Sequence, residues 1–415
     1  MAPTVRCPLV RRILVVSSIA VILGIGCGDD DGPAELDVPD PWNCDEFVDG
    51  ADLSVDRFNH ETVVLDDERV LLIAGHEDDD GAAVRTDTWE VFNVADDSVE
   101  VEATEFEQPR RNTSTARLPS DNIMVVGGED ASGDGLTSTK IFDIENLEWI
   151  PGPDMNLPYP EAIELDDGRV LALGLRHGTS QDPVEIRGQI FDPDDFDWHS
   201  APTADLPHNQ VGDFTADRVY GGDIAVAYGH VAPAADQIPD AELPDGVDVT
   251  VYESAAVKYD YDDGTVDTLA EFDHQGVGFE FDFVELPYMR KSLLQIDTRE
   301  YDEEEFEEIE AETLAKLYDP GSESFDEHDT YDSSPGTVVE VVPRDKLIYV
   351  DSAPVEIHDV DEQSWVNFVQ IPDGIYYTSM DLLADDRLFV SGERSASGHD
   401  RRGVTAGYCE PASDD

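Results

Sequence analysis

The chain has little positive charge. Its 415 residues contain 25 Lys and Arg against 96 Asp and Glu, which gives a formal net charge of −71 at pH 7, and only five of the cations are lysines. Nucleic-acid binding depends on cationic contacts to phosphate, so this charge excludes nucleic acid as a partner. The surplus carboxylates should keep the protein hydrated and monomeric. Two settings suit such acidity: a saline habitat, in which salt screens the self-repulsion, or binding of calcium at several sites.

Cysteine is also scarce, with only Cys7, Cys27, Cys44 and Cys409 in the chain. Residues 1–26 have the form of a processing signal, because arginines precede the apolar run 13–25. That run is too short to span ~30 Å of hydrocarbon as a helix. Its end, Leu23-Gly24-Ile25-Gly26-Cys27, resembles a bacterial lipobox, in which the cysteine carries the lipid, although Gly24 stands where that motif prefers leucine. Ordinary cleavage without lipid and an uncleaved anchor are the alternatives.

Residues 27–41 are rich in Asp and Pro and cannot bury a core. They are expected to form an acidic flexible tether between a lipid-modified Cys27 and the folded part. The predicted address is therefore the bacterial cell envelope, with a lipid anchor in the outer membrane or at the cell surface. The folded part is expected to span residues 42–410, and residues 411–415 to form a short tail.

An internal repeat organises the rest of the chain. In six places an aromatic residue or histidine is followed by Asp or Asn, and a bulky residue stands seven positions after the first. The copies are Phe92-Asn93 with Val99, Phe142-Asp143 with Trp149, Phe191-Asp192 with Trp198, Tyr259-Asp260 with Val266, Tyr318-Asp319 with Phe325, and His358-Asp359 with Trp365. This spacing predicts a hairpin: the aromatic ends one strand, Asp or Asn forms the turn, and the bulky residue begins the return strand.

A short aliphatic run follows a turn signal upstream of each hairpin. The runs are residues 70–75, 123–128, 170–174, 224–229, 292–297, 346–351 and 388–392. Short apolar runs bounded by turns predict strands that are buried on both faces. Less regular strands are expected before them, as at 61–65, 114–118 and 161–165. Four strands per repeated unit predict the blade of a β-propeller.

The combined pattern resembles the kelch repeat, which also builds the central domain of galactose oxidase. The pattern begins with a turn, continues with an aliphatic strand that starts with Val-Leu and ends in Gly, and closes with an aromatic-Asp pair followed by Trp. It covers nearly all of residues 42–410. Only one unit, with Gly127-Gly128, has the full glycine pair. The resemblance implies an all-β, seven-bladed kelch-like propeller. A different β-repeat, such as a solenoid, is the alternative.

The last unit has no outer strand of its own after Tyr408-Cys409. Residues 42–48 precede the first unit and begin with Trp42, so we expect them to supply that strand and to remove an open sheet edge. Cys44 and Cys409 would then lie on neighbouring strands. In an oxidising envelope, two such leftover cysteines are expected to form a disulfide.

Two insertions extend the fourth and fifth units. Residues 231–250 are rich in Pro and Asp, and residues 300–312 are strongly acidic. In the second insertion the spacing of Tyr301, Phe306, Ile309 and Leu314 predicts a short helix.

Residues that directly follow the aliphatic strands should lie around one mouth of the propeller channel. The candidate ligand-binding residues in these positions are His76, Glu129, Arg176, His177, His230, Glu393 and Arg394. Histidines in such positions can bind metals or transfer protons, but no short His motif connects them. A polar lining of the mouth is the alternative, so no metal site and no catalytic residue is predicted.

No cofactor is expected either. The Asp clusters at 78–81, 130–135 and 260–264 lack the full ligand set and closing Glu of a calcium loop, and turn chemistry accounts for them. Calcium remains the alternative. A copper site like that of galactose oxidase needs a Tyr crosslinked to Cys. Both remaining cysteines, Cys44 and Cys409, are already assigned to the predicted disulfide. The fold resemblance therefore does not imply that activity.

Two functions fit these observations. The first is a membrane-tethered module that binds a protein or glycan at the envelope, and the second is a carbohydrate-active enzyme that uses His76, Arg176, His177 and His230. A structural component of the envelope without a specific ligand is a third possibility. Convergence of the histidines and Glu129 on one point would favour an enzyme.

The predicted disulfide between Cys44 and Cys409 can be tested directly. Mass spectrometry of the mature protein without reduction should find the Cys44 and Cys409 peptides joined, and reduction should lower stability by about 4–5 kcal/mol if loop entropy dominates. Detection of two free thiols would show that the assignment is wrong.

Overall fold

The structure is a computed structural model that describes part of the chain. The described residues are 15–16, 19–20, 44–55, 57–58, 60–66, 68–79, 82–85, 88–105, 110, 113–130, 132–177, 183–232, 250–286, 289–302, 307–331, 337–342, 346–350, 355–360, 364–369, 375–383, 387–395 and 401–411. The predicted lipid site Cys27 and the tether 27–41 lie outside them. In several strands near the two ends of the chain, only the backbone is described.

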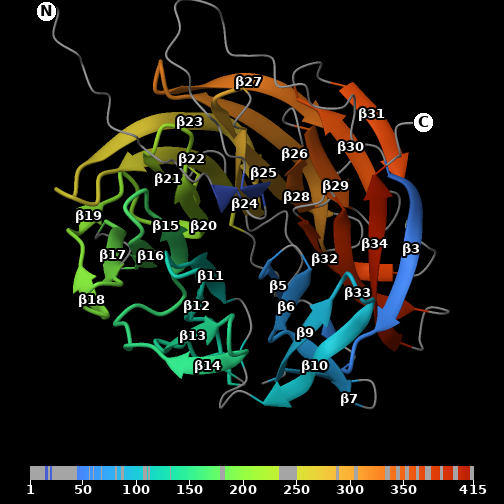
Figure 1. The fold of residues 1–415 in the computed structure, drawn as a ribbon. Helices are drawn as coiled ribbons and strands as arrows, with labels where there is room; N and C mark the ends of the chain where they lie inside the picture. Colours follow the sequence, from blue (N-terminus) through green and yellow to red (C-terminus); the bar gives the residue numbers. More distant parts are fainter. Residues whose placement is uncertain are drawn as a thin grey trace, which may run out of the picture.

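The described residues form antiparallel β-sheets and no helix. None of them therefore makes a helix long and apolar enough to cross a membrane. Most sheets have four strands in chain order, as in the propeller blades that the repeat predicts. The sheets follow one another around a common centre (Figure 1).

The first three sheets cover residues 61–205. The first contains β5 (Glu61–Val64), β6 (Arg69–Ile73), β9 (Thr88–Asn93) and β10 (Ser98–Glu105). The second contains β11 (Ser114–Arg117), β12 (Ile123–Val126), β13 (Thr139–Asp143) and β14 (Glu148–Pro151). The third contains β15 (Glu161–Glu164), β16 (Val170–Arg176), β17 (Glu185–Asp192) and β18 (Asp197–Ser200), with β19 (Ala204–Asp205) also paired to β17.

The next three sheets cover residues 211–369. The fourth contains β20 (Val211–Arg218), β21 (Ile224–Val231), β22 (Tyr252–Tyr259) and β23 (Val266–Gly276). The fifth contains β24 (Gly278–Leu286), β25 (Lys291–Asp302), β26 (Glu307–Asp319) and β27 (Ser324–Tyr331). The sixth contains β28 (Thr337–Val342), β29 (Lys346–Val350), β30 (Val355–Asp359) and β31 (Ser364–Val369).

The last sheet combines strands from both ends of the domain. It contains β32 (Ile375–Leu382), β33 (Leu388–Ser395) and β34 (Arg401–Pro411), with β3 (Cys44–Asp52) as its outer strand. Two smaller sheets complete the described structure. One pairs β1 (Val15–Val16) with β2 (Ile19–Ala20), and the other contains β4 (Arg57–Phe58), β7 (His76–Asp79) and β8 (Ala82–Arg85).

The strand register confirms the hairpin repeat. In all six copies the aromatic residue or histidine pairs directly with the bulky residue seven positions later, for example Phe142 with Trp149 and His358 with Trp365. The aliphatic runs form the second strand of each sheet, and they are almost fully buried in β6, β12, β16 and β21. The predicted spacing therefore marks the outer hairpin of each sheet.

The core lies between neighbouring sheets. Leu71 and Ile73 of the first sheet pack with Ile123 and Val125 of the second, and similar clusters join each following pair up to the sixth sheet. On its other face the first sheet packs against the last one, where Phe92 and Phe389 have ring centroids 5.6 Å apart. The first five sheets thus bury both faces, which explains why their second strands are largely apolar.

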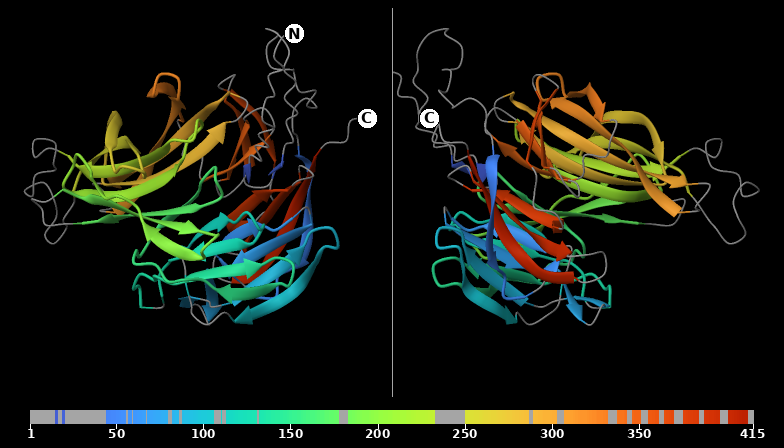
Figure 2. Two further views of the ribbon diagram at one scale, coloured as in Figure 1. Left: turned by 60° about the vertical axis from the view of Figure 1, so that its left-hand side comes forward. Right: turned by 90° about the vertical axis from the view of Figure 1, so that its right-hand side faces the viewer.

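Strand β3 occupies the predicted place beside β34. Phe47 pairs with Cys409 and Val48 with Tyr408, and both views in Figure 2 show β3 running along the C-terminal strands. Cys44 pairs with Pro411, two positions beyond Cys409, so the two cysteines lie on adjacent strands but not directly opposite each other. Their disulfide stays a prediction.

The predicted helix within residues 300–312 is wrong. Strands β25 and β26 continue their hairpin through this region, with Glu300 paired to Ile309 and Tyr301 to Glu308. A short isolated helix is costly to nucleate, whereas each further residue of a hairpin that already exists adds backbone pairing. Residues 233–249 of the other insertion lie outside the described part of the chain.

A buried ion pair fixes the segment between β3 and β5. The Arg57 guanidinium lies 3.0 Å from the Glu90 carboxylate, and both side chains are fully buried. Arg57 also donates hydrogen bonds to the carbonyl oxygens of Ala74 and Thr88. The second oxygen of Glu90 accepts hydrogen bonds from the backbone N–H and the hydroxyl of Ser54. The segment that connects the last sheet to the first is therefore anchored in the first sheet.

Replacement of Glu90 by alanine should destabilise the fold strongly. It leaves the Arg57 charge buried without its carboxylate, and such losses typically cost about 3–5 kcal/mol. Urea unfolding measures the difference. Glu323→Ala is the matched control, because it removes a carboxylate that is 59% exposed in its ion pair with Lys258 and should cost at most about 1 kcal/mol. Equal effects of the two substitutions would contradict the anchoring role of Glu90.

Candidate functional site

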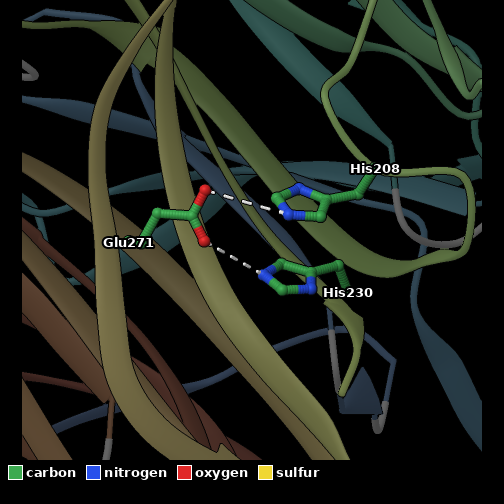
Figure 3. A group of neighbouring side chains, drawn as sticks. All are labelled: His208, His230 and Glu271. Atoms are coloured by element: carbon green, nitrogen blue, oxygen red, sulfur yellow. Dashed lines mark ion pairs between the residues drawn. The ribbon is translucent and has the colours of Figure 1, made fainter. Parts of the chain in front are cut away.

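Three side chains from different segments meet beside the fourth sheet. Nε2 of His208 and Nε2 of His230 each lie 3.8 Å from a different oxygen of the Glu271 carboxylate. The two imidazole rings are stacked, with centroids 3.5 Å apart and an interplanar angle of 3°. Figure 3 shows the carboxylate facing both rings. This group is called the His208 cluster below, and it comprises His208, His230 and Glu271.

The pairing of the fourth sheet places two members of the cluster. Tyr228 on β21 pairs with Ala255 on β22, which in turn pairs with Glu271 on β23. Residues opposite each other share a face of the sheet, and His230 shares it too because it follows Tyr228 by two positions. Ala255, which lies between Tyr228 and Glu271, is fully buried in the core on this face. This face is the one that packs against the third sheet.

His208 arrives from the connection between β19 and β20. Its carbonyl oxygen accepts a hydrogen bond from the backbone N–H of Val184, the residue directly before β17 of the third sheet. Its ring atom Nδ1 lies 3.0 Å from the hydroxyl of Tyr228, which is fully buried. Burial raises the pKa of the Tyr228 phenol far above its usual value, so the hydroxyl keeps its proton. Tyr228 therefore holds the His208 ring with Nε2 directed to the carboxylate.

Burial differs between the three members. His230 is 4% exposed, and its buried Nε2 has no hydrogen-bond partner. His208 is half-buried, and burial followed by the nearness of His230 lowers the pKa of its imidazole, which keeps it neutral at pH 7. The Glu271 side chain is 57% exposed. The cluster thus combines one buried ring nitrogen, one half-buried imidazole and one exposed carboxylate.

Such a set can act in two ways. Imidazole nitrogens and a carboxylate are common ligands of divalent transition metals, and these ligand atoms all lie within 4.8 Å of one another. The same atoms can exchange hydrogen bonds with a polar ligand, because neutral imidazole both donates and accepts and a carboxylate accepts. Among the side chains that the structure describes, this is the one group of His, Cys, Asp and Glu with metal-site spacing.

The structure describes the side chains of four predicted site residues, namely Glu129, Arg176, His177 and His230. Of these, only His230 belongs to the His208 cluster among the described side chains. Arg176 is exposed and forms an ion pair of 3.1 Å with Glu185, and His177 is exposed beside it. Glu129 is half-buried in a bridge with Gly135. The described histidines therefore do not converge with Glu129.

The other candidates are described only through their backbones. His76 begins β7, where it pairs with Phe58 and Arg85. Glu393 and Arg394 lie in β33 and pair with Tyr376 and Ile375. Their predicted role in ligand binding is neither supported nor contradicted.

The sequence did not indicate His208 and Glu271 as site residues. His208 lies in a connecting segment and Glu271 on an outer strand, away from the positions that follow aliphatic strands. No short motif links His208, His230 and Glu271, because three separate elements supply them. Only the register of β21, β22 and β23, together with the course of the β19–β20 connection, brings them together.

Five acidic residues with a raised pKa lie on the first strands of their sheets. Burial is the main cause that raises the pKa of Glu61, Glu161 and Asp217 to about 7. It likewise raises the pKa of Asp282 and Asp381 to about 6. Nearby carboxylates add to the shift, since Asp381 acts on Glu61 and Asp217 acts on Glu161. Part of the surplus negative charge is thus held where protonation is favoured.

Comparison with known proteins gives a partial likeness. No family model matches the chain. Two galactose oxidases of Gibberella zeae are 34% identical over 84 residues, which is 20% of this chain and 11% of each relative. The chain thus spans only a small part of these relatives. The crystal structure of polysaccharide lyase Uly1 superposes with a TM-score of 0.53 at 8% identity, covering 88% of this chain and 99% of that one. The likeness supports a propeller-type fold.

The protein should become more stable as the pH falls from 8 to about 5. Folding raises the pKa of these five carboxylates, so the folded state binds more protons than the unfolded state between about pH 4 and 7. Stability is then lost as the pH rises through that window. His60 opposes the trend, because burial and Arg57 lower its pKa to about 3. Thermal unfolding as a function of pH measures the sum.

A pair of variants isolates the inner carboxylates. Glu61→Gln with Asp381→Asn should flatten the pH dependence of the melting temperature. The matched control, Glu145→Gln with Asp195→Asn, makes the same charge change at exposed positions and should leave the slope as it is. Equal slopes in both double variants would contradict the assignment.

Proposed function

We propose that the chain is a seven-bladed kelch-like propeller that binds carbohydrate at the envelope of a bacterial cell. Three observations support the closed ring. The sheets follow in chain order, the first sheet packs on the last, and β3 supplies the outer strand of the last sheet. A ring closed in this way leaves no unpaired edge between its ends. The likeness to Uly1 over most of both chains agrees with this arrangement.

The observation that carries the proposed binding role is the His208 cluster. It places Nε2 atoms of two histidines and a carboxylate at the border between two sheets, where His208 and Glu271 reach the surface. A sugar hydroxyl can donate one hydrogen bond and accept another. The imidazoles can donate to it or accept from it, and the carboxylate can accept from it. The names of the proteins with a similar sequence segment or fold, galactose oxidase and polysaccharide lyase, point to carbohydrate as well.

The charge of the chain narrows the ligand class. A net charge of −71 repels anionic polysaccharides at moderate salt. We therefore propose a neutral glycan or one that carries amino groups. Nucleic acid is disfavoured for the same reason, and the self-repulsion favours a monomer.

The remaining parts of the proposal concern the anchor. A lipid on Cys27 would attach the propeller to the membrane through the tether 27–41, in the outer membrane or at the cell surface. A disulfide between Cys44 and Cys409 would fasten β3 to β34, which are neighbours in the last sheet. No cofactor is needed for the binding role.

A carbohydrate-active enzyme is the second candidate. The observation that favours it is the hydrogen bond between Tyr228 and Nδ1 of His208, because it orients a neutral imidazole toward a carboxylate. A histidine held in this way can take up or release a proton. Release of shortened or unsaturated sugars from a bound glycan would support the enzyme over the binding module.

The proposed binding role predicts a ligand on an array of neutral and amino-containing glycans. Binding by the full-length chain should weaken at least about 10-fold in Glu271→Ala, which removes one or more charge-assisted hydrogen bonds. His199→Ala is the matched control, because His199 is exposed and pairs with Asp195 on the third sheet, and it should bind as the parent does. Absence of any bound glycan, or equal binding by Glu271→Ala, would contradict the proposal.

A further inference from the structure

We propose that the His208 cluster binds a divalent transition-metal ion of the zinc type. The ligands would be Nε2 of His208, Nε2 of His230 and the carboxylate of Glu271. The inference uses the residues of the proposed function but needs no carbohydrate, so the two can fail separately. It differs from the sequence prediction, which favoured a polar lining over a metal site at the histidines and named calcium as the alternative cofactor.

The donor set selects the kind of ion. Calcium and magnesium take oxygen ligands, whereas zinc is bound by imidazole nitrogen and carboxylate oxygen. Two histidines with one carboxylate leave a coordination position open for water or another ligand. Among the described residues, no other group with metal-site spacing supplies nitrogen ligands. The two kinds of site can therefore be separated by the choice of ion.

The buried nitrogen of His230 is the second, independent observation. Its side chain is 5% exposed, and Nε2 faces Glu271 at 3.8 Å without a hydrogen-bond partner. Leaving a buried polar atom unpaired costs free energy, and binding of a metal ion would satisfy it. The atom belongs to the cluster and points to the position that the ion would take.

Tyr228 provides the outer support that metal-binding histidines usually have. Its hydroxyl lies 3.0 Å from Nδ1 of His208 and can accept a hydrogen bond from the ring N–H. With the proton on Nδ1, the lone pair of Nε2 is available to the ion. Because Tyr228 is fully buried, its hydroxyl is a fixed partner for Nδ1, about which the His208 ring can still tilt.

Binding requires a small rearrangement that the exposed members allow. Tetrahedral zinc at ~2.0–2.1 Å from each ligand brings the ligand atoms to about 3.4 Å from one another, closer than the present spread of up to 4.8 Å. The stacked rings must also tilt, because an ion cannot lie in both parallel planes. His208 is half-buried and Glu271 is exposed, so these two can move while the buried His230 stays in place.

The test is a titration of the purified full-length chain, made without a polyhistidine tag, with Zn²⁺ and separately with Co²⁺. An excess of Mg²⁺ and added salt keep the many surface carboxylates from contributing. We expect one tight equivalent of Zn²⁺, and for Co²⁺ visible absorption bands of a low-coordinate site. No carbohydrate is present, so the result does not depend on the proposed ligand.

Three variants decide whether the cluster is the site. Glu271→Gln and His208→Ala should each lower the Zn²⁺ affinity at least ~100-fold, since loss of a ligand exceeds the 10–100-fold effect of an outer-shell change. Tyr228→Phe should lower it about 10-fold or more by freeing the His208 ring. His199→Ala is the control and should bind as the parent does. Glu271 is exposed, so its replacement leaves the fold intact and keeps the test meaningful if a histidine variant is unstable.

Two results would overturn the inference. One is the absence of a tight Zn²⁺ equivalent under Mg²⁺ competition, and the other is unchanged affinity in Glu271→Gln together with His208→Ala. Zinc binding without any glycan binding would support the metal site and contradict the proposed function. Glycan binding that depends on Glu271 without zinc binding would do the reverse.

Discussion

Antiparallel pairing between β3 and β34 joins the beginning of the described domain to its end, and the arrangement of the sheets depends on it. Without β3, the last sheet would expose the backbone edge of β34. The connection from β3 to β5 passes through Arg57, whose buried ion pair with Glu90 ties it to the first sheet. The two interactions complement each other. Strand pairing places β3 in the last sheet, and the Arg57–Glu90 ion pair fixes where the chain enters the first sheet. Phe92 and Phe389 then fill the space between these two sheets.

The same packing of sheet on sheet creates the His208 cluster. The face of the fourth sheet that carries Tyr228, His230 and Glu271 is largely apolar and is covered by the third sheet. At the rim of this contact the connection before β20 adds His208, and Tyr228 holds its ring. Burial removes water from one side of the histidines while Glu271 stays exposed. The border between the third and fourth sheets is therefore where two ring nitrogens and an exposed carboxylate come together.

The acidity of the chain has two structural consequences that composition does not distinguish. Many of the described carboxylates are exposed to water, where they favour solubility and repel anionic partners. A few lie on the inner strands, where burial and mutual repulsion raise their pKa toward neutrality, as for Glu61 beside Asp381. The net charge thus accounts for how the chain interacts with water and anions, whereas the position of each carboxylate in the fold determines its pKa.

The sequence by itself determined the strands and their pairing within a sheet. The seven-residue spacing from Phe142 to Trp149 and from Tyr318 to Phe325 is local, and a hairpin turn of fixed length converts it into a direct pair. It also predicted β3 as the outer strand of the last sheet. It failed at residues 300–312, where an apolar spacing typical of a helix gave way to the extension of an existing hairpin. Only the tertiary structure decided the site: His208, His230 and Glu271 come from a connection and two strands that are not neighbours in the sheet. Such a site rests on cross-strand register and on the packing of one sheet against the next, which no short motif encodes.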